Sequence, residues 1–185
     1  MYHAVFWRDM NLNEVKRMIL DMQPVLCGEK NKIDFEFTFV PDKDGALAQT
    51  FRDIEFTSPV SVSGYVKSMA EYMFLHEDIR LEYKTDCARC AEPVTGKLSF
   101  SFEKDIATDD VSRDNDDYIF PDDKKLDLIS PAEEELMLEL PSKTLCREDC
   151  AGLCPKCGKN LNEGKCSCPE HEGDPRLQIL KTLLK

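Results

Sequence analysis

Apolar and polar residues alternate along several short stretches of the chain. The clearest is Ile33–Phe39, where every second residue is apolar and the residues between them are polar. A two-residue period is typical of a β-strand that buries one of its faces. The same step recurs in four further stretches, at 54–56, 60–66, 79–83 and 97–102. The pattern therefore predicts a mainly antiparallel sheet with one face against a core.

Residues 127–140 carry the signals of a helix. Pro131 lies near the start and Glu133–Glu135 follow it, which suits the fixed φ of proline and the positive end of a helix. Leucines at every second position of 136–140 break the helical period, so the last turn is predicted to be either helical or extended before the following proline ends it. A second helix is predicted at 176–184, where leucines three and four residues apart share one face.

Cysteine is concentrated in two places along the chain. Of the nine cysteines, eight are clustered, namely Cys87, Cys90, Cys146, Cys150, Cys154, Cys157, Cys166 and Cys168. Met1–Met10 lacks the apolar region and cleavage site of a secretory signal, so an oxidising compartment and disulfides are not expected. Eight clustered thiolates are the number that two tetrahedral four-sulfur zinc sites require. We therefore predict two structural zinc ions.

Two ways of dividing the eight thiols between the sites fit the spacing. In the first, the four cysteines up to Cys150 form one site and the four from Cys154 onward form the other. In the second, Cys87 and Cys90 join Cys154 and Cys157, as in a zinc ribbon. The first arrangement is favoured because it uses all eight thiols and closes short loops in the tail.

Other uses of the cysteines fit the sequence less well. A redox dithiol favours a Cys-x-x-Cys pair at the start of a helix after a strand, and neither pair has that setting. An iron–sulfur cluster satisfies the same thiolate count and stays open as an alternative. Cys27 stands apart and is interpreted as a small buried apolar side chain or a free thiol. A catalytic zinc site keeps an open position beside an acid or base, and no such constellation is visible, so no enzyme is expected.

The charge of the chain is acidic and unevenly spread. A net charge of −12 argues against nucleic-acid binding by the whole surface. From Ser142 onward, however, eight basic residues stand against six acidic ones, a balance of +2, whereas the rest of the chain carries −14. If the tail contacts RNA, it does so through a small local patch, for which the best-placed cations are Arg147, Lys156, Lys159 and Lys165. The alternative is that these four side chains only keep a compact module soluble. No apolar run approaches the ~20 residues that span a membrane, and the cytosol is the expected compartment.

The chain is expected to divide into three parts. Residues 1–17 form an N-terminal lead, 18–141 form a β-rich domain, and 142–185 form a cysteine-rich zinc module with the C-terminal helix. Within the β-rich domain, 109–127 holds eight aspartates and is predicted to be a solvated acidic loop, since like charges repel and resist packing. The expected fold class is α+β, a mainly antiparallel, barrel-like sheet followed by the zinc module and its short terminal helix.

The cysteine-rich segment resembles a known family. Its run Cys146-Arg-x-x-Cys-x-Gly-Leu-Cys-x-x-Cys-Gly-x-Asn-Leu-Asn-x-Gly-x-Cys-x-Cys168, followed by Asp174-Pro-Arg-Leu177, is similar to the YceD family. The members of this family are the large ribosomal RNA subunit accumulation proteins of bacteria and plastids. Cys87-x-x-Cys90 after alternating strands also fits, and Met18-Ile-Leu-Asp21 resembles the family's usual beginning.

The resemblance implies a role in accumulation or processing of the 23S ribosomal RNA precursor, and hence in assembly of the large ribosomal subunit. As partners it implies the precursor RNA or large-subunit assembly proteins, with no membrane and no small-molecule substrate. The expected function is that of a non-enzymatic, zinc-binding factor. A metal-dependent RNA-processing enzyme and a thiol redox sensor are the alternatives.

Overall fold

The computed structural model describes residues 18–42, 44–69, 72–107 and 118–168. They fall into two compact units. The first takes the chain up to Thr85 together with Val94–Ser142, and the second takes Asp86–Pro93 together with the chain from Lys143 onward. The second unit thus combines a short internal loop with the cysteine-rich tail. The domain limits predicted from the sequence stay a prediction, because compactness alone does not show which part folds by itself.

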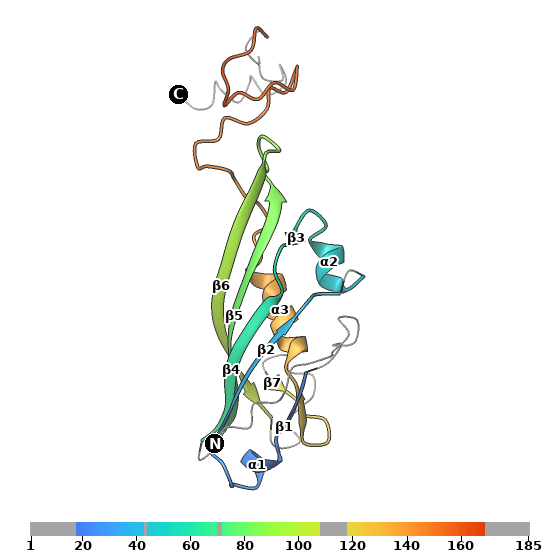
Figure 1. Cartoon of the computed structure of the whole chain (residues 1–185), viewed down its shortest axis with the longest axis vertical. Coiled ribbons are helices and arrows are strands. Elements are labelled where there is room, and N and C mark those ends of the chain that lie inside the picture. Colours follow the sequence, from blue (N-terminus) through green and yellow to red (C-terminus); the bar gives the residue numbers. More distant parts are fainter. Residues whose placement is uncertain (1–17, 43, 70–71, 108–117, 169–185) are drawn as a thin grey trace, which may run out of the picture. The chain divides into compact units, whose positions relative to one another are not determined.

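A six-stranded sheet dominates the first unit (Figure 1). Its strands are β2 (Lys32–Phe39), β3 (Glu55–Phe56), β4 (Val60–Ser68), β5 (Met73–Asp86), β6 (Pro93–Ile106) and β7 (Tyr118–Ile119). The order is β2-β4-β5-β6-β7, and β3 pairs with β5 beside this path. A separate pair, β1 (Ile19–Asp21) with β8 (Lys125–Asp127), is antiparallel.

The pairing confirms the predicted fold class. β2 with β4, β4 with β5, and β3 with β5 are all antiparallel, while β6 with β7 is parallel. The long strands curl, so that the sheet forms a half-barrel. Along β5 the residues at odd positions from Met73 to Tyr83 are buried, as the two-residue period requires. Each of the five stretches with this period lies in or overlaps a strand, and the protein is α+β.

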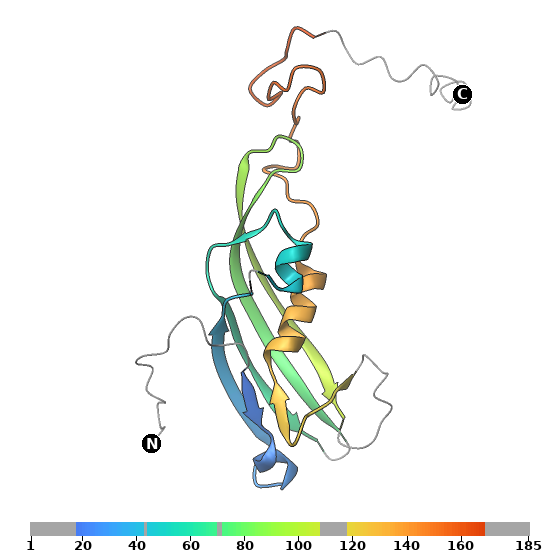
Figure 2. The same cartoon turned by 90° about the vertical axis from the view of Figure 1, so that its right-hand side faces the viewer.

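In the described parts of the chain three short helices accompany the sheet, and α3 (Ile129–Glu139) is the longest of them. Figure 2 shows α3 and α2 (Ala46–Thr50) on one side of the sheet, and α1 (Gln23–Leu26) lies near its end. Leu136 is buried in the core that also holds the apolar residues of β5, whereas Leu138 is 76% exposed. The helical alternative for the end of this segment is therefore confirmed as far as Glu139, and only Leu140 is extended.

The predicted acidic loop at 109–127 needs a correction. Its second half contains β7 and β8, because Leu126 is buried in the apolar core and the half-buried Ile119 packs against it, despite the aspartates around them. The aspartates of the sequence therefore hid two short strands. The lead at 1–17 and the helix at 176–184 lie outside the described residues. Within the described part of the chain, no helix has the length and apolar character needed to cross a bilayer.

One charged side chain is fully buried in the core of the first unit. Glu77 of β5 stands between the buried residues Leu75 and Ile79, at a position where the alternation calls for an apolar residue. Its side chain faces the interior of the half-barrel. Neither of its carboxylate oxygens has a hydrogen-bond partner among the described residues. Burial first, and the nearby Asp127 second, raise the pKa of Glu77 to about 8 against a smaller opposing effect of Lys104. This carboxyl group is therefore largely protonated at neutral pH.

Candidate metal centres

The second unit has no apolar core of its own among the described residues. Every residue of the hydrophobic core belongs to the first unit, and the buried side chains of the second unit are Cys87, Cys90, Cys150 and Cys154. From 143 to 168 there is no helix or strand, only an isolated bridge between Leu153 and Asn160. A segment this short and poor in apolar burial needs cross-links to hold one structure. The cysteines are the groups able to supply them.

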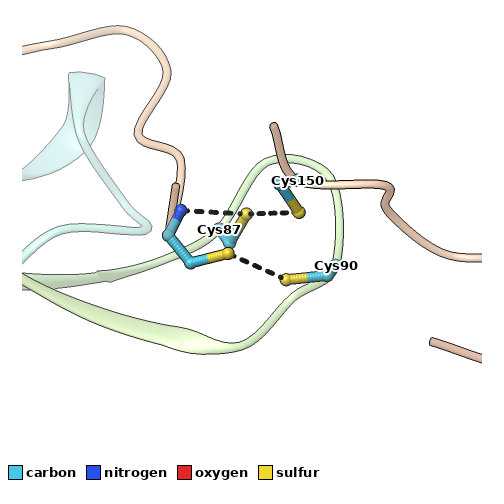
Figure 3. A group of neighbouring side chains, drawn as sticks. Cys87, Cys90 and Cys150 are labelled. Atoms are coloured by element: carbon cyan, nitrogen blue, oxygen red, sulfur yellow. Dashed lines mark hydrogen bonds between the residues drawn. The ribbon is translucent and has the colours of Figure 1, made fainter. Parts of the chain in front are cut away.

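The first group of sulfurs joins the β5–β6 connection to the tail. Cys87 and Cys150 have Sγ atoms 3.8 Å apart, and the Sγ atoms of Cys90 and Cys146 are 3.6 Å apart. All four sulfurs lie within 4.8 Å of one another. Figure 3 shows the sulfurs of Cys87, Cys90 and Cys150 turned toward a common centre. We call this set the first tetrad.

The second tetrad lies wholly within the tail and consists of Cys154, Cys157, Cys166 and Cys168. Its sulfurs are also within 4.8 Å of one another, and the Sγ atoms of Cys154 and Cys166 are 3.5 Å apart. The grouping in the structure is thus that of the first arrangement considered above, and the ribbon-like alternative is not the one adopted. All nine cysteines are free thiols, so no disulfide competes with these groupings.

The sulfur spacing fits a tetrahedral metal ion. A zinc–sulfur bond of ~2.3 Å places the corners of a tetrahedron ~3.8 Å apart. The three Sγ–Sγ distances given above, 3.5, 3.6 and 3.8 Å, match this edge. They are far longer than the ~2.05 Å of a disulfide bond. Both donor sets therefore suit a soft, tetrahedral cation such as zinc.

The two Cys-x-x-Cys loops share one backbone geometry. In the loop of Cys87, the N–H of Ala91 donates to the carbonyl of Cys87 (2.9 Å), and the N–H of Cys87 donates to the carbonyl of Glu92 (2.8 Å). The same two bonds recur around Cys154, with Gly158 and Lys159 as partners at 2.8 Å each. The fourth residue after the first cysteine has positive φ in both loops, 57° at Ala91 and 73° at Gly158.

This equivalence predicts opposite effects of two matched substitutions. Ala91→Gly should stabilise the second unit by about 0.5–1 kcal/mol, because glycine adopts positive φ without strain. Gly158→Ala should destabilise it by about 1 kcal/mol through the backbone alone, since an added Cβ there meets nothing within 4 Å. Native-state hydrogen exchange of the metal-loaded protein measures both changes. Stability changes of the same sign in the two variants would contradict the shared backbone geometry.

Hydrogen bonds to sulfur surround the first tetrad. The N–H of Cys146 points at the Sγ of Cys87 (3.4 Å), and the Nδ2 of Asn162 donates to the Sγ of Cys150 (3.4 Å). The Oδ1 of Asn162 also accepts from the N–H of Ala151 (2.8 Å) and from the Nη2 of Arg147 (2.7 Å). Asn162 thus fixes the segment around Cys150 by hydrogen bonds. It orients the sulfur of Cys150 without itself being a member of the first tetrad.

We expect Asn162→Leu to weaken metal retention by the first tetrad about 10- to 100-fold, because the sulfur of Cys150 loses its donor and the turn around it loses two acceptor contacts. Competition with a colour-forming chelator measures the loss. Glu163→Gln, at an exposed neighbouring residue, is the matched control and should leave retention unchanged. Identical release from Asn162→Leu and wild type would show that this side chain does not support the ligand.

The thiols of each tetrad differ in acidity when no metal is bound. The N–H of Cys146 lowers the pKa of Cys87 to about 6, whereas burial and the neighbouring thiols raise the pKa of Cys146 to about 12. In the second tetrad the N–H of Cys157 lowers the pKa of Cys154 to about 6, and the hydrogen bond with Cys157 raises the pKa of Cys168 to about 12. Cys87 and Cys154 are therefore mostly thiolates at neutral pH, whereas Cys146 and Cys168 are protonated and release their protons when a metal binds.

The four cations assigned to phosphate contact are all exposed on the second unit. Arg147 is nevertheless engaged within the module, because it bonds to Asn162 and its Nε lies 3.4 Å from the Oδ1 of Asp149. The Nζ of Lys159 donates to the carbonyl of Lys165 (3.2 Å). Contact of these side chains and of Lys156 with RNA stays a prediction.

Two further residues complete the comparison with the sequence. Cys27 is an exposed free thiol, so of the two interpretations offered for it the buried one is wrong. It follows α1 directly, at the chain reversal before β2. Arg89, inside the Cys87–Cys90 loop, donates from Nη1 to the carbonyl of Cys150 (2.9 Å) and was not singled out from the sequence. No pattern of spacing marks such a contact across 61 residues.

Comparison with known proteins gives a family and several relatives. A family model described as "Large ribosomal RNA subunit accumulation protein YceD" matches residues 75–184. An uncharacterised protein of Mycobacterium tuberculosis (strain H37Rv) is 33% identical over 127 residues, which are 64% of this chain and 59% of that protein. An uncharacterised protein of Mycobacterium leprae is 27% identical over 112 residues, 58% of this chain and 52% of that protein.

A plant protein carries a functional name. The chloroplastic "Large ribosomal RNA subunit accumulation protein YCED homolog 1" of Arabidopsis thaliana is 37% identical over 54 residues, 29% of this chain and 17% of that protein. The chain thus spans less than two thirds of the length of the curated relatives it matches. No solved structure gives a significant match.

Proposed function

The chain belongs to the YceD family, and from this premise we propose that it is a zinc-binding, non-enzymatic factor for accumulation or processing of the 23S ribosomal RNA precursor. Through that RNA it would act in assembly of the large ribosomal subunit. The observation that carries the proposal is the pair of cysteine tetrads, since all eight of their residues fall inside the segment that the family model matches. The name of the Arabidopsis relative supports the same role.

Zinc is the proposed metal because of the donor set. Among the described residues, both tetrads present four sulfurs and no oxygen or nitrogen ligand, at spacings that suit a tetrahedron. Hydrogen bonds such as that from Arg89 to the carbonyl of Cys150 join the Cys87–Cys90 loop to the tail. Because the second unit has no apolar core among the described residues, the ions would hold it in one structure. When bound, zinc supplies this cross-linking and no reaction step.

The same geometry supports a non-enzymatic role. A hydrolytic zinc site leaves one coordination position open for water, with a general base nearby. Four sulfurs around each centre would fill every position of a tetrahedral ion. We therefore propose that the module presents a surface rather than a reaction centre, and that its partners are the 23S precursor or proteins of large-subunit assembly in the cytoplasm. Arg147, Lys156, Lys159 and Lys165 are the proposed contacts with RNA phosphates.

Depletion of the protein in its own cell tests this function. We expect large subunits to fall relative to small ones in sucrose gradients, with 23S precursors accumulating or total 23S RNA decreasing. Complementation should succeed with wild type and with Cys27→Ser, and fail with Cys154→Ser at equal protein abundance. Normal subunit profiles after complete depletion would overturn the proposed role, and rescue by Cys154→Ser would separate that role from the metal centres.

A further inference from the structure

The outward face of the sheet in the first unit carries a group of ring side chains. Tyr65 of β4 stacks on His76 of β5 with ring centroids 4.9 Å apart, and it meets Phe74 edge-on at 6.0 Å. Tyr72 stacks on Phe74 at 5.9 Å and is 52% exposed. We call Tyr65, Tyr72, Phe74 and His76 the aromatic patch.

The register of the strands explains why these rings meet. Tyr65 is paired with His76, and Lys67 with Phe74, in the antiparallel ladder of β4 and β5. Their sequence neighbours, such as Val66 and Leu75, are buried on the other face, so the patch points away from the core. Rings at these positions are not needed to fill the core, and three of the four are only half-buried.

Carboxylates surround the aromatic patch on three strands. They are Asp34 and Glu36 of β2, Asp78 of β5 and Glu103 of β6. His76 lies between two of them, with its Nδ1 3.1 Å from Glu103 and its Nε2 3.5 Å from Asp78. An open hollow in this face is lined by Asp34, Glu36, Asp78 and one side of Tyr65.

The chain itself shows how a cation sits on this face. The Nζ of Lys32 lies 4.1 Å from the centre of the Tyr65 ring and 2.6 Å from the Oδ1 of Asp34. A ring face together with a carboxylate is the environment that favours ammonium and guanidinium groups. Glu36, Asp78 and Glu103 place further carboxylates beside the rings, at positions that Lys32 does not occupy.

We propose that this face is a docking surface for an extended, arginine- and lysine-rich segment of a protein partner. Four carboxylates against the cations Lys32, Lys67 and Arg80 leave it net acidic by one charge, within a stretch of chain that carries −14 up to residue 141. A cationic segment gains ion pairs and contacts with the rings here, whereas RNA phosphates meet repulsion. The aromatic rings supply contact area that fixes the segment, and the carboxylates steer it.

This surface goes beyond the function proposed above, because it lies in the first unit and contains no ligand of either tetrad. It assigns partner binding to the acidic sheet and leaves phosphate contact to the cations of the tail. The two assignments are independent, so either one can fail without the other.

Titration of the full-length, zinc-loaded protein tests the proposal. The probe is a short fluorescent peptide that alternates arginine and glycine, compared with a glutamate–glycine peptide of equal length and with single-stranded oligouridylate. We expect binding of the basic peptide alone, weakening as salt rises, with amide shifts in nuclear magnetic resonance spectra confined to β2, β4, β5 and β6. The double variant Asp78→Asn, Glu103→Gln should bind about tenfold more weakly.

Matched variants separate the face from general charge. Glu29→Gln with Asp53→Asn removes the same charge from exposed residues off the sheet and should change the affinity by less than about twofold. Tyr72→Ser should weaken binding about threefold through loss of the ring. Equal losses in both double variants, shifts confined to the second unit, or oligouridylate bound on this face in preference to the peptide would each overturn the proposal. Unchanged amide spectra away from the substituted sites confirm that the variants are folded.

Discussion

Replacement of Cys87 by serine is expected to remove one of two metal ions and to unfold the part of the second unit that the first tetrad holds, while the second tetrad keeps its ion. Structural zinc contributes about 10–16 kcal/mol to small zinc-dependent folds, because the binding free energy is also folding free energy. The second unit has no described apolar core to compensate for the loss. Metal analysis should show a fall from two ions to one, and limited proteolysis should cut the tail rapidly.

Cys27→Ser is the matched control for this prediction. Cys27 is an exposed thiol outside both tetrads, so this variant should keep two ions and resist proteolysis as wild type does. The sheet of the first unit should remain folded in Cys87→Ser, because its core includes no residue of the second unit. Two retained ions in Cys87→Ser would show that Cys87 is not a ligand.

Replacement of Glu77 by glutamine is expected to stabilise the first unit at alkaline pH. The folded-state pKa of Glu77 is about 8, against an ordinary value of 4.5. Between these values the unfolded chain has lost the proton that the folded chain keeps, so stability falls as pH rises, by up to about 1.4 kcal/mol per pH unit. The loss of stability due to Glu77 is absent below its pKa in the unfolded chain and complete above its pKa in the folded protein. Glutamine has nearly the same shape and no titration, so it removes the penalty.

Denaturant unfolding at a series of pH values measures this effect. Glu77→Gln should resemble wild type near pH 4 and exceed it by roughly 3–5 kcal/mol near pH 9. The groups that face Glu77 are Asp127 and Lys104, and Lys104 is itself held by Glu134 and Glu135 at 3.0 and 3.2 Å. Glu29→Gln, at an exposed residue, should show no such divergence. Parallel pH profiles for Glu77→Gln and wild type would mean that Glu77 is solvated in the folded protein.

Features encoded locally were predictable from the sequence. The two-residue period located β2 and β4 within one or two residues, because burying one face of a strand dictates alternation. The Cys-x-x-Cys spacing and the following glycine marked the Cys154 loop, because a single turn supplies two ligands. The tetrads themselves combine this local geometry with a count of thiols, which is why the spacing left two groupings open.

Features that depend on distant contacts were not predictable. Asn162 lies in a plain polar turn by sequence, and its role follows only from the fold of the tail around Cys150. The sequence does show one acidic residue, Glu77, at a position of β5 where the alternation calls for an apolar one. Its raised pKa, however, depends on the packing of β8 and β6 nearby, which the sequence does not show. The eight aspartates of 109–127 predicted a loop. The apolar residues Ile119 and Leu126 pack against the core because β7 pairs with β6 and β8 pairs with β1, which the local sequence does not show.

The central claim, that two closed four-sulfur zinc centres hold the second unit, is tested most directly by metal analysis. The protein is purified without added metal and without oxygen, and its metal content and coordination are measured. We expect two zinc ions per chain, and X-ray absorption at the zinc edge should show four sulfur neighbours at ~2.3 Å and no lighter ligand. An oxygen or nitrogen atom in the coordination shell, iron in place of zinc, or fewer than two ions in the folded protein would contradict two closed four-sulfur centres.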